Sequence, residues 1–208
     1  MKNKLLLDAL ALFLITLVSG FGLSYIYEIT KEPITIQAEQ KTLKANQAVF
    51  PDAVTFEDDA DLMGLLEDTD LVSMNADYTG VTIDNISKAL SSSSELLGYN
   101  ITVSTSAGYK NGIQIVYGYA KDGTIKGVEF LAINETAGLG MNAAQPAYKD
   151  QYVGKQVQQF AVTKTGATSE DQIDALSGAT ITSRAVTNAI NTGINFVTSN
   201  STEIGGGQ

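Results

Sequence analysis

The feature that most constrains the fold is an almost uninterrupted apolar run near the N-terminus. It extends from Leu5 to Tyr27, and Asp8 is its only charged residue. About 20 residues of α-helix are enough to cross the hydrocarbon layer of a bilayer. The run therefore predicts a transmembrane anchor, residues 1–30, with the rest of the chain on one side of a membrane.

The charges on either side of the run predict its orientation. Lys2 and Lys4 precede it, whereas residues 28–32 after it carry two acids and one lysine. Because lysine and arginine are retained in the cytoplasm, we expect a single-pass protein of the cell membrane with a cytoplasmic N-terminus and an extracytoplasmic domain. A cleavable signal peptide is the alternative, but its apolar core would be about 7 to 15 residues long, and this run continues past Ser19 and Gly20.

Small residues recur along one face of the predicted anchor. Thr16, Gly20 and Ser24 are spaced by four, which allows a second helix to approach closely. Ordinary use of small residues in membrane helices would give the same spacing. The pattern is compatible with a membrane partner and does not require one.

Composition excludes several classes of protein. The chain has no Cys and no His, so thiolate-held iron–sulfur clusters, disulfides, His-ligated haem or zinc and His-based catalytic triads are excluded. A redox protein of this composition must therefore use an organic cofactor. The net charge of −10 argues against nucleic acid as a partner, because binding it requires clustered cations.

Acidic residues are concentrated in one stretch. Ten carboxylates and no basic residue lie between Lys44 and Lys88. A solvated acidic face is the expectation. The spacing is not that of a calcium-binding loop, and no metal site is predicted.

The segment between the anchor and residue 98 predicts helices and irregular structure. Residues 34–49, free of proline and glycine, predict a loosely amphipathic helix that ends at Pro51. The acidic stretch that follows predicts irregular structure, and Asp84–Leu97 predicts a second helix. We therefore expect residues 31–97 to form a helical and acidic irregular segment of the outer domain.

After residue 98 the apolar residues recur at every second position, which is typical of β-strands. Residues 99–109, 113–119 and 128–132 alternate between apolar and polar, and the turn sequence 121–124 favours a hairpin. A further strand is expected at 160–163. The pattern predicts an antiparallel meander of about three strands.

The last element is the clearest helix. We expect Thr180 or a near neighbour at its N-cap. The pattern thus predicts a core at 98–200, followed by a disordered tail at 201–208, and the fold class is α+β, with an antiparallel sheet and flanking helices behind one transmembrane helix. The apolar stripe of the last helix consists of Ile181, Ala185, Ala189, Ile190, Ile194 and Val197.

A loop of small residues, Ser177-Gly178-Ala179-Thr180, leads into this helix. Free N–H groups and the positive end of the helix dipole make such a position a natural phosphate site, which small side chains leave accessible. Arg184 follows one turn later on the same face and can pair with an anion there. Plain helix capping is the alternative that the loop alone leaves open.

A second loop with two glycines follows the last predicted strand of the meander. Its glycines lack the spacing of a dinucleotide-binding fingerprint, so by itself it is an ordinary strand-end loop. Its sequence is Glu135-Thr136-Ala137-Gly138-Leu139-Gly140.

Together the two loops resemble the FMN-binding domain family. Residues 174–180 are similar to its flavinylation motif, in which a flavin transferase joins the phosphate of FMN to the hydroxyl of the closing threonine, here Thr180. Residues 135–140 resemble the family's Glu-Thr-Pro-Gly-Leu-Gly segment, which approaches the flavin, and residues 152–155 resemble its aromatic-x-Gly-Lys stretch. The cofactor-binding residues that this resemblance implies are Thr180, Ser177, Gly178, Ala179, Leu176, Glu135, Thr136, Gly138, Leu139, Gly140, Thr182 and Ser183.

The chain departs from the family pattern at two positions. Ala137 replaces the usual proline, and Ala175 stands where glycine or serine is common. A second Gly-Ala-Thr ends at Thr168, but it lacks the preceding aspartate and the amphipathic helix that follows Thr180. The resemblance therefore implies a covalent FMN, held by a phosphoester at Thr180.

The anchor and its exit, residues 27–34, resemble the G subunit of the Rnf-type ion-pumping ferredoxin–NAD oxidoreductase complex. This resemblance implies an electron-transfer protein that carries electrons through FMN beside other membrane subunits, after maturation by a flavin transferase. No catalytic acid or base is expected, because the flavin carries the electrons. Two alternatives remain: the equivalent C subunit of a sodium-pumping NADH–quinone oxidoreductase, and a non-redox anchored binding module.

Overall fold

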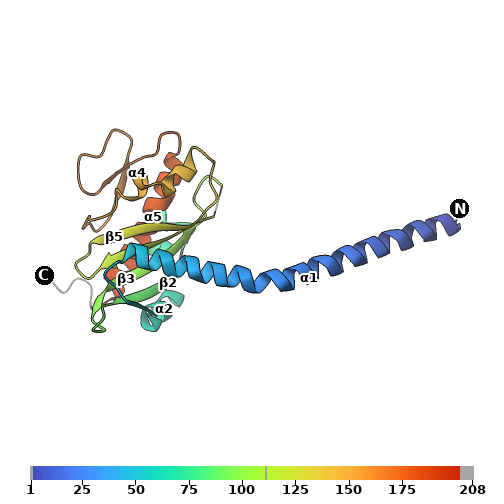
Figure 1. The fold of residues 1–208 in the computed structure, drawn as a ribbon. Helices are drawn as coiled ribbons and strands as arrows, with labels where there is room; N and C mark the ends of the chain where they lie inside the picture. Colours follow the sequence, from blue (N-terminus) through green and yellow to red (C-terminus); the bar gives the residue numbers. More distant parts are fainter. Residues whose placement is uncertain (1, 111, 202–208) are drawn as a thin grey trace. The chain divides into compact units, whose positions relative to one another are not determined.

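A computed structural model of the chain describes residues 2–110 and 112–201 (Figure 1). The chain divides into two units, Met1–Thr42 and Leu43–Gln208. The first unit is helical, and the second contains the sheet and its covering helices. Residues 202–208, most of the tail predicted to be disordered, lie outside the described residues.

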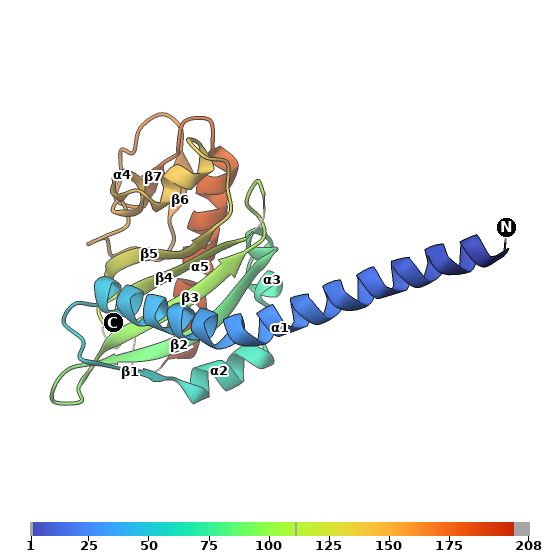
Figure 2. The ribbon, with the colours of Figure 1, turned by 45° about the vertical axis from the view of Figure 1, so that its right-hand side comes forward.

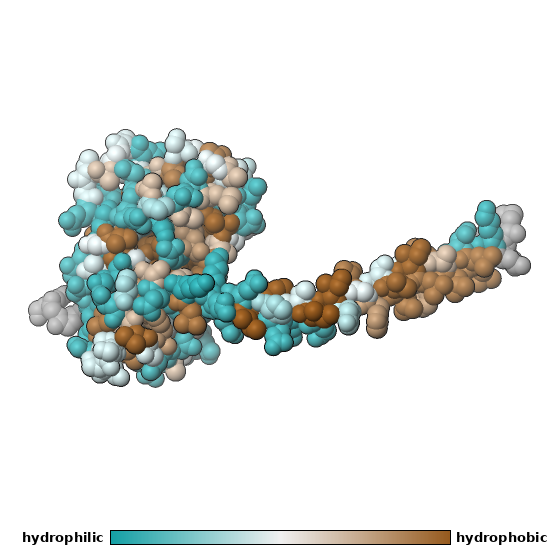
Figure 3. All heavy atoms as spheres, viewed as in Figure 1, coloured by the Kyte–Doolittle hydropathy of each residue, from teal (hydrophilic) through white to brown (hydrophobic). Residues whose placement is uncertain are grey.

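The N-terminal helix α1 extends from Lys2 to Val49. It is long and apolar enough to cross a membrane, and Figure 3 shows the apolar side chains gathered along its N-terminal half. Residues 34–49 are helical as predicted, but they continue the anchor helix and do not begin a new one. Pro33 lies inside the helix, where it removes one backbone N–H donor, and no glycine between Pro33 and Val49 ends the helix in a left-handed turn.

The second unit is built on a five-stranded antiparallel sheet of order β1-β2-β3-β4-β5 (Figure 2). Every strand therefore pairs with its neighbour in sequence, and the α+β class with an antiparallel sheet is confirmed. The meander is longer than the three strands expected. Its strands are β1 Thr55–Asp58, β2 Val81–Leu90, β3 Leu96–Thr105, β4 Ile113–Ala120 and β5 Ile125–Ile133.

The main core lies between this sheet and the last helix, α5, which extends from Thr180 to Asn200. Figures 1 and 2 show α5 behind β3 and β4. Ile190 and Ile194 are fully buried in this core, as the predicted stripe requires, whereas Ile181 is 55% exposed. The Ile181 side chain therefore lies outside the core, although Thr182 and Ser183 in the same turn are buried.

The other face of the sheet receives the last turn of α1. Ala45 and Val49 pack there against Val116 of β4 and Leu131 of β5. Two glycines on these strands make the close approach possible, because a Cβ on Gly127 would lie 2.8 Å from the Cα of Val49, and Gly118 is equally crowded. The end of α1 is thus fixed to the sheet by backbone contact.

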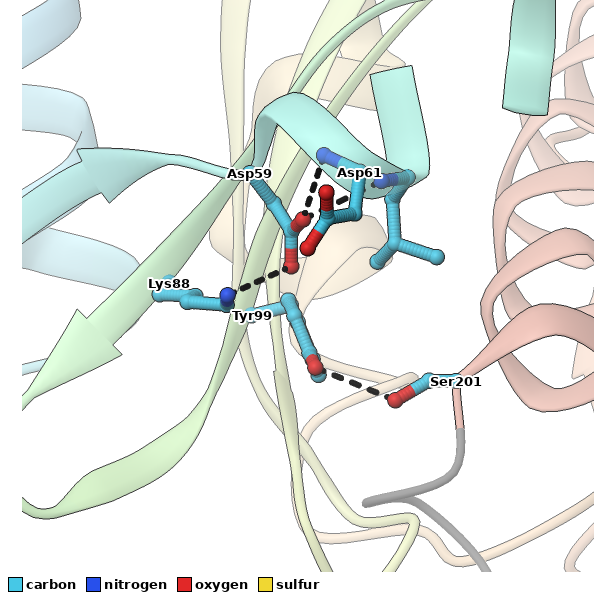
Figure 4. A network of polar contacts seen from close by, with 6 residues as sticks. Asp59, Asp61, Lys88, Tyr99 and Ser201 are labelled. Carbon is cyan, nitrogen blue, oxygen red and sulfur yellow. Dashed lines mark hydrogen bonds and ion pairs between the residues drawn. The ribbon is translucent and has the colours of Figure 1, made fainter. Parts of the chain in front are cut away.

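The acidic stretch is ordered, which corrects the prediction that it is irregular. Its carboxylates act as helix caps: Asp59 Oδ1 accepts hydrogen bonds from the N–H groups of Asp61 and Leu62, and Asp59 Oδ2 pairs with Lys88 at 3.2 Å (Figure 4). Asp70 caps the next short helix in the same way. The elements formed are β1 Thr55–Asp58, α2 Ala60–Glu67, α3 Leu71–Met74 and the 3₁₀ turn η1 Ala76–Tyr78.

The predicted helix at Asp84–Leu97 is wrong, because these residues form β2, a turn and the start of β3. A β-bulge between Ile83 and Asn85 shifts the alternation, so that the buried Ile86 follows Ile83 by three residues. This spacing imitates a helical period. The serine run 91–94 is the hairpin turn, in which the N–H of Ser91 donates a hydrogen bond to the carbonyl of Glu95.

Above the sheet lies a loop-rich region between β5 and α5. It contains the 3₁₀ turn η2 Gly140–Ala144, the short helix α4 Pro146–Lys149, and two short strands, β6 Ala161–Thr163 and β7 Gln172–Asp174. The strand predicted at 160–163 is confirmed, but it pairs in parallel with β7 and does not join the main sheet. This region carries the chain from the end of β5 to the start of α5.

The glycine contact beneath α1 gives a test of the fold. Gly127→Ala should lower the free energy of unfolding by about 1 to 3 kcal/mol, because the added methyl meets the backbone of Val49. Urea unfolding of the full chain in detergent, followed by circular dichroism, measures this change. Gly64→Ala on α2 is the control: a Cβ there meets nothing within 4 Å, and the change should stabilise by up to about 1 kcal/mol. Equal effects of the two variants would contradict the packing described.

Candidate functional site

A cavity of about 550 Å³ opens where three segments of the second unit meet. These segments are the loop after β3, the strand-end loop after β5 and the first turn of α5. Its volume lies within the usual range of small-molecule sites. The lining residues are Tyr109, Glu135, Thr136, Leu139, Gly140, Gly178, Ala179, Thr180, Ile181 and Thr182.

The first turn of α5 enters this cavity without a cap. Ala179 occupies the N-cap position and offers no side-chain hydrogen bond. No acceptor among the described residues contacts the backbone N–H groups of Thr180, Ile181 or Thr182. Free N–H groups at the positive end of a 21-residue helix attract an anion. The Thr180 hydroxyl belongs to the same turn.

Glu135 forms a buried wall of the cavity and is 5% exposed. One carboxylate oxygen accepts a hydrogen bond from the Thr182 hydroxyl at 3.2 Å, and the other accepts one from the N–H of Lys110 at 3.3 Å. Two glycines leave room for this carboxylate. A Cβ on Gly140 would lie 2.7 Å from Glu135 Oε2, and a Cβ on Gly108 would lie even closer to Oε1. Glu135 thus joins all three segments of the cavity.

The apolar wall of the cavity comes from exposed side chains. Tyr109, Leu139 and Ile181 are 68%, 43% and 55% exposed. Gly178 has φ +74°, a backbone conformation that favours glycine, and a Cβ there would lie 3.2 Å from the Leu139 side chain. The wall therefore suits a flat apolar group. The apolar side chains provide its surface, and Gly178 allows the loop before α5 to lie close to Leu139.

Ser183 holds the loop that precedes α5. Its hydroxyl accepts a hydrogen bond from the N–H of Leu176 at 3.0 Å and donates one to the carbonyl of Ala179 at 3.1 Å. Its carbonyl accepts from the hydroxyls of Tyr148 and Thr187. The residue is fully buried, so it fixes the shape of residues 176–180.

Two buried tyrosines form hydrogen bonds with the part of α5 that contains Ser183. The hydroxyls of Tyr148 and Tyr152 lie 3.1 Å apart, and Tyr152 also contacts the Thr187 hydroxyl at 2.8 Å. Burial raises the pKa of Tyr148 above its ordinary value and raises the pKa of Tyr152 well above it. Both phenols therefore remain protonated and neutral within the network.

The structure brings together most of the residues singled out in the sequence. Eight of the twelve line the cavity: Glu135, Thr136, Leu139, Gly140, Gly178, Ala179, Thr180 and Thr182. Leu176, Ser177, Gly138 and Ser183 do not line it, and two of these shape its loops: Gly138 has φ +75°, and Ser183 holds residues 176–180.

Sequence reasoning misses Tyr109 and Ile181 as lining residues. The alternating pattern places Tyr109 at the end of a strand, and the helical pattern places Ile181 on the buried stripe of the last helix. An apolar residue at the second position of a helix that follows a phosphate-binding loop is the signal that could have identified Ile181. Nothing in the local sequence distinguishes Tyr109, because its position depends on where the β3–β4 hairpin places the loop.

Two other residues considered in the sequence, Thr168 as a second possible attachment point and Arg184 as an anion partner, do not line the cavity. Thr168 is exposed in the loop between β6 and β7, where its hydroxyl donates to the side chain of Gln172. Arg184 is exposed on α5 and forms no ion pair within residues 2–110 and 112–201. Its side chain does not line the cavity.

Comparisons with known proteins identify the family of the chain. Residues 108–195 match the FMN-binding domain family. The chain is 31% identical over 195 residues to the G subunit of the Na(+)-translocating ferredoxin:NAD(+) oxidoreductase complex of Acetobacterium woodii, a match that covers 89% of this chain and 87% of that relative. It is 27% identical to the G subunit of the ion-translocating oxidoreductase complex of Methanosarcina acetivorans, covering 88% and 89%.

Among solved structures, NqrC of Shewanella oneidensis aligns with 55% of this chain and 59% of its own length. The TM-score is 0.47 and the sequence identity is 24%. This structural likeness is too low to inform function.

The hydrogen bonds of Ser183 give a test of the site's construction. Ser183→Ala leaves the N–H of Leu176 without its acceptor, so the free energy of unfolding should fall by about 1 to 3 kcal/mol. Urea unfolding of the full chain in detergent measures the loss. Ser177→Ala is the matched control, because Ser177 is exposed and its removal should change stability by no more than about 0.5 kcal/mol. A neutral Ser183→Ala would show that the loop is held by other contacts.

Proposed function

Because the chain belongs to the family of the G subunits of ion-translocating oxidoreductase complexes, and carries an FMN-binding domain, we propose that it holds FMN through a phosphoester at Thr180. At the coarser level it is a flavoprotein electron-transfer subunit of such a complex, anchored in the membrane through α1. We further propose that the domain lies on the extracytoplasmic side of the membrane and that its redox partners are other subunits of the complex.

The observation that carries the proposal is the convergence of three features in one cavity. Its lining includes Thr180, which carries the hydroxyl, the first residues of α5, whose N–H groups are uncapped, and the apolar residues Leu139 and Tyr109. FMN has a phosphate at one end and a flat, largely apolar ring at the other. The residues present therefore fit the group: the helix end would hold the phosphate, and the side chains would contact the ring.

Thr180 is favoured over Thr168 as the attachment point. Thr180 begins a 21-residue helix, so its phosphate meets a helix dipole and free N–H groups. Thr168 lies in a surface loop with no helix behind it, and its hydroxyl and N–H both contact Gln172. An ester at Thr168 would lose that contact and gain no neutralising group.

The bond requires a separate flavin transferase and an activated flavin donor. The Thr180 hydroxyl loses its proton, its oxygen bonds to the phosphorus, and the activating group of the donor leaves. Ser177, Gly178 and Thr180 are exposed or half-buried, so the loop is accessible to such an enzyme. Once attached, the flavin supplies the one- and two-electron chemistry, and the protein residues hold and orient it.

The proposed location of the domain is the extracytoplasmic side of the membrane. Lys2 and Lys4 precede the apolar segment and its exit is acidic, which favours a cytoplasmic N-terminus. The other subunits of an Rnf-type complex are the proposed redox partners. The ferredoxin:NAD(+) name of the Acetobacterium woodii relative favours this assignment over the quinone-reducing alternative.

The ester at Thr180 can be tested by removing its hydroxyl. Thr180→Val should keep the fold and abolish covalent flavin fluorescence on a denaturing gel, when the chain is produced together with a flavin transferase. Thr168→Val, in the surface loop, should retain full fluorescence. Peptide mass mapping of the wild-type chain should locate one FMN adduct between residues 174 and 184. Fluorescence that survives in Thr180→Val would refute the attachment point.

The second prediction concerns orientation. Because the chain has no Cys, a single introduced cysteine reports its own location. Lys164→Cys, at an exposed position of the β6–β7 loop, should react with a membrane-impermeant maleimide in intact cells. Lys4→Cys should react only after the membrane is permeabilised. The reverse pattern would place the domain in the cytoplasm.

A further inference from the structure

The cavity has an unusual charge for a site that receives a nucleotide phosphate. Of its ten lining residues only Glu135 is charged, and it is an acid. No lysine or arginine lines the cavity among the described residues. Many phosphate sites include cationic side chains that pair with the phosphate oxygens, whereas this lining offers the free N–H groups of α5 alone. A phosphate in this cavity would therefore be held by backbone N–H groups beside a carboxylate, without a cationic side chain from the lining.

The positive end of α5 only partly compensates for this carboxylate. A helix N-terminus is equivalent to about half a positive charge, whereas Glu135 carries a full negative charge. The carboxylate accepts a hydrogen bond from Thr182, in the same turn that presents the N–H groups. The N–H groups of α5 therefore attract an incoming anion, while the neighbouring carboxylate of Glu135 repels it.

The charge of the phosphate differs between the free and esterified cofactor. A phosphate monoester carries about 1.5 to 2 negative charges at neutral pH, whereas a diester has lost its second ionisable oxygen and carries one. Beside a buried carboxylate the monoester is disfavoured more strongly, because Coulomb repulsion is large where water is excluded. The charge of the lining accordingly disfavours free FMN more than it disfavours the diester.

The nearby cations do not reverse this balance. The backbone N–H of Lys110, and not its ammonium group, contacts Glu135. The side chains of Lys110 and Arg184 are exposed, where water and salt screen them. Tyr109, Leu139 and Ile181, in contrast, provide an uncharged wall for a flavin ring.

We propose that the cavity, before modification, binds the uncharged riboflavin moiety in preference to free FMN, and that Glu135 determines this selectivity. The inference rests on the proposed function in one respect only, since it takes this cavity as the flavin site. It assigns to Glu135 a role in ligand discrimination that is separate from attachment. FMN is then retained by the bond to Thr180, and ionic contacts contribute little.

The test uses the full chain in detergent, produced without a flavin transferase so that Thr180 is unmodified. Riboflavin and FMN are titrated separately, and binding is measured by equilibrium dialysis at low ionic strength. Wild type should bind riboflavin about tenfold more tightly than FMN. Glu135→Gln, which keeps the shape of the side chain, should reduce this ratio to about twofold or less by strengthening FMN binding, with riboflavin affinity little changed.

Two controls separate this effect from general charge and from misfolding. Glu170→Gln removes one exposed carboxylate from the β6–β7 loop and should leave the ratio unchanged. Unaltered riboflavin binding by Glu135→Gln shows that its cavity is intact, and loss of binding of both flavins would overturn the assigned role. In the wild type, raising the salt concentration should reduce the discrimination against FMN.

The outcomes distinguish this inference from the proposed ester. Wild type that binds FMN as tightly as riboflavin, or binds no riboflavin, overturns the selectivity. A ratio that Glu135→Gln leaves unchanged overturns the role of Glu135. An absent adduct at Thr180 in the mature protein refutes the ester without affecting these binding results.

Discussion

The uncapped start of α5 is the constraint on which the rest of the site depends. A helix leaves its first N–H groups without partners, and here neither Ala179 nor any described side chain satisfies them. The protein tolerates this because the rest of the helix is anchored firmly. Ser183 is held on both its hydroxyl and its carbonyl, and the helix beyond it is buried against the sheet. The free N–H groups at the N-terminal end of α5 thus remain available to bind a ligand.

The cavity exists because glycine occupies positions where a methyl group would not fit. Gly140 and Gly108 make room for the carboxylate of Glu135, and Gly178 brings the loop close to Leu139. These glycines have different physical roles. The first two prevent collision with a buried charge, whereas Gly178, with φ +74°, also allows a left-handed turn. Replacing any of them would alter the cavity before it altered the core.

Sequence reasoning identifies the residues that line this cavity more readily than the helices and strands that carry them. Loop residues such as Thr180 and Gly140 are recognisable because their chemistry is local. The helix expected at Asp84–Leu97 arises because a β-bulge gives Ile83 and Ile86 a helical spacing, and a bulge depends on pairing with a strand that local sequence does not reveal. The contacts of Glu135 with the first turn of α5 and with the loop after β3 likewise arise only from the fold, since the three segments are far apart in the chain.

A cavity of this charge and a covalent bond belong together physically. Cations around the phosphate would strengthen non-covalent binding of FMN, and they would also stabilise added electrons on the flavin and raise its reduction potential. A wall made of Tyr109, Leu139 and the single carboxylate Glu135 has the opposite tendency, because a negative charge disfavours reduction of a nearby group. With the proposed ester at Thr180 holding the cofactor, the walls need not supply affinity. Their composition is then free to set the electrostatic environment of the ring, which in an electron carrier is the property that matters.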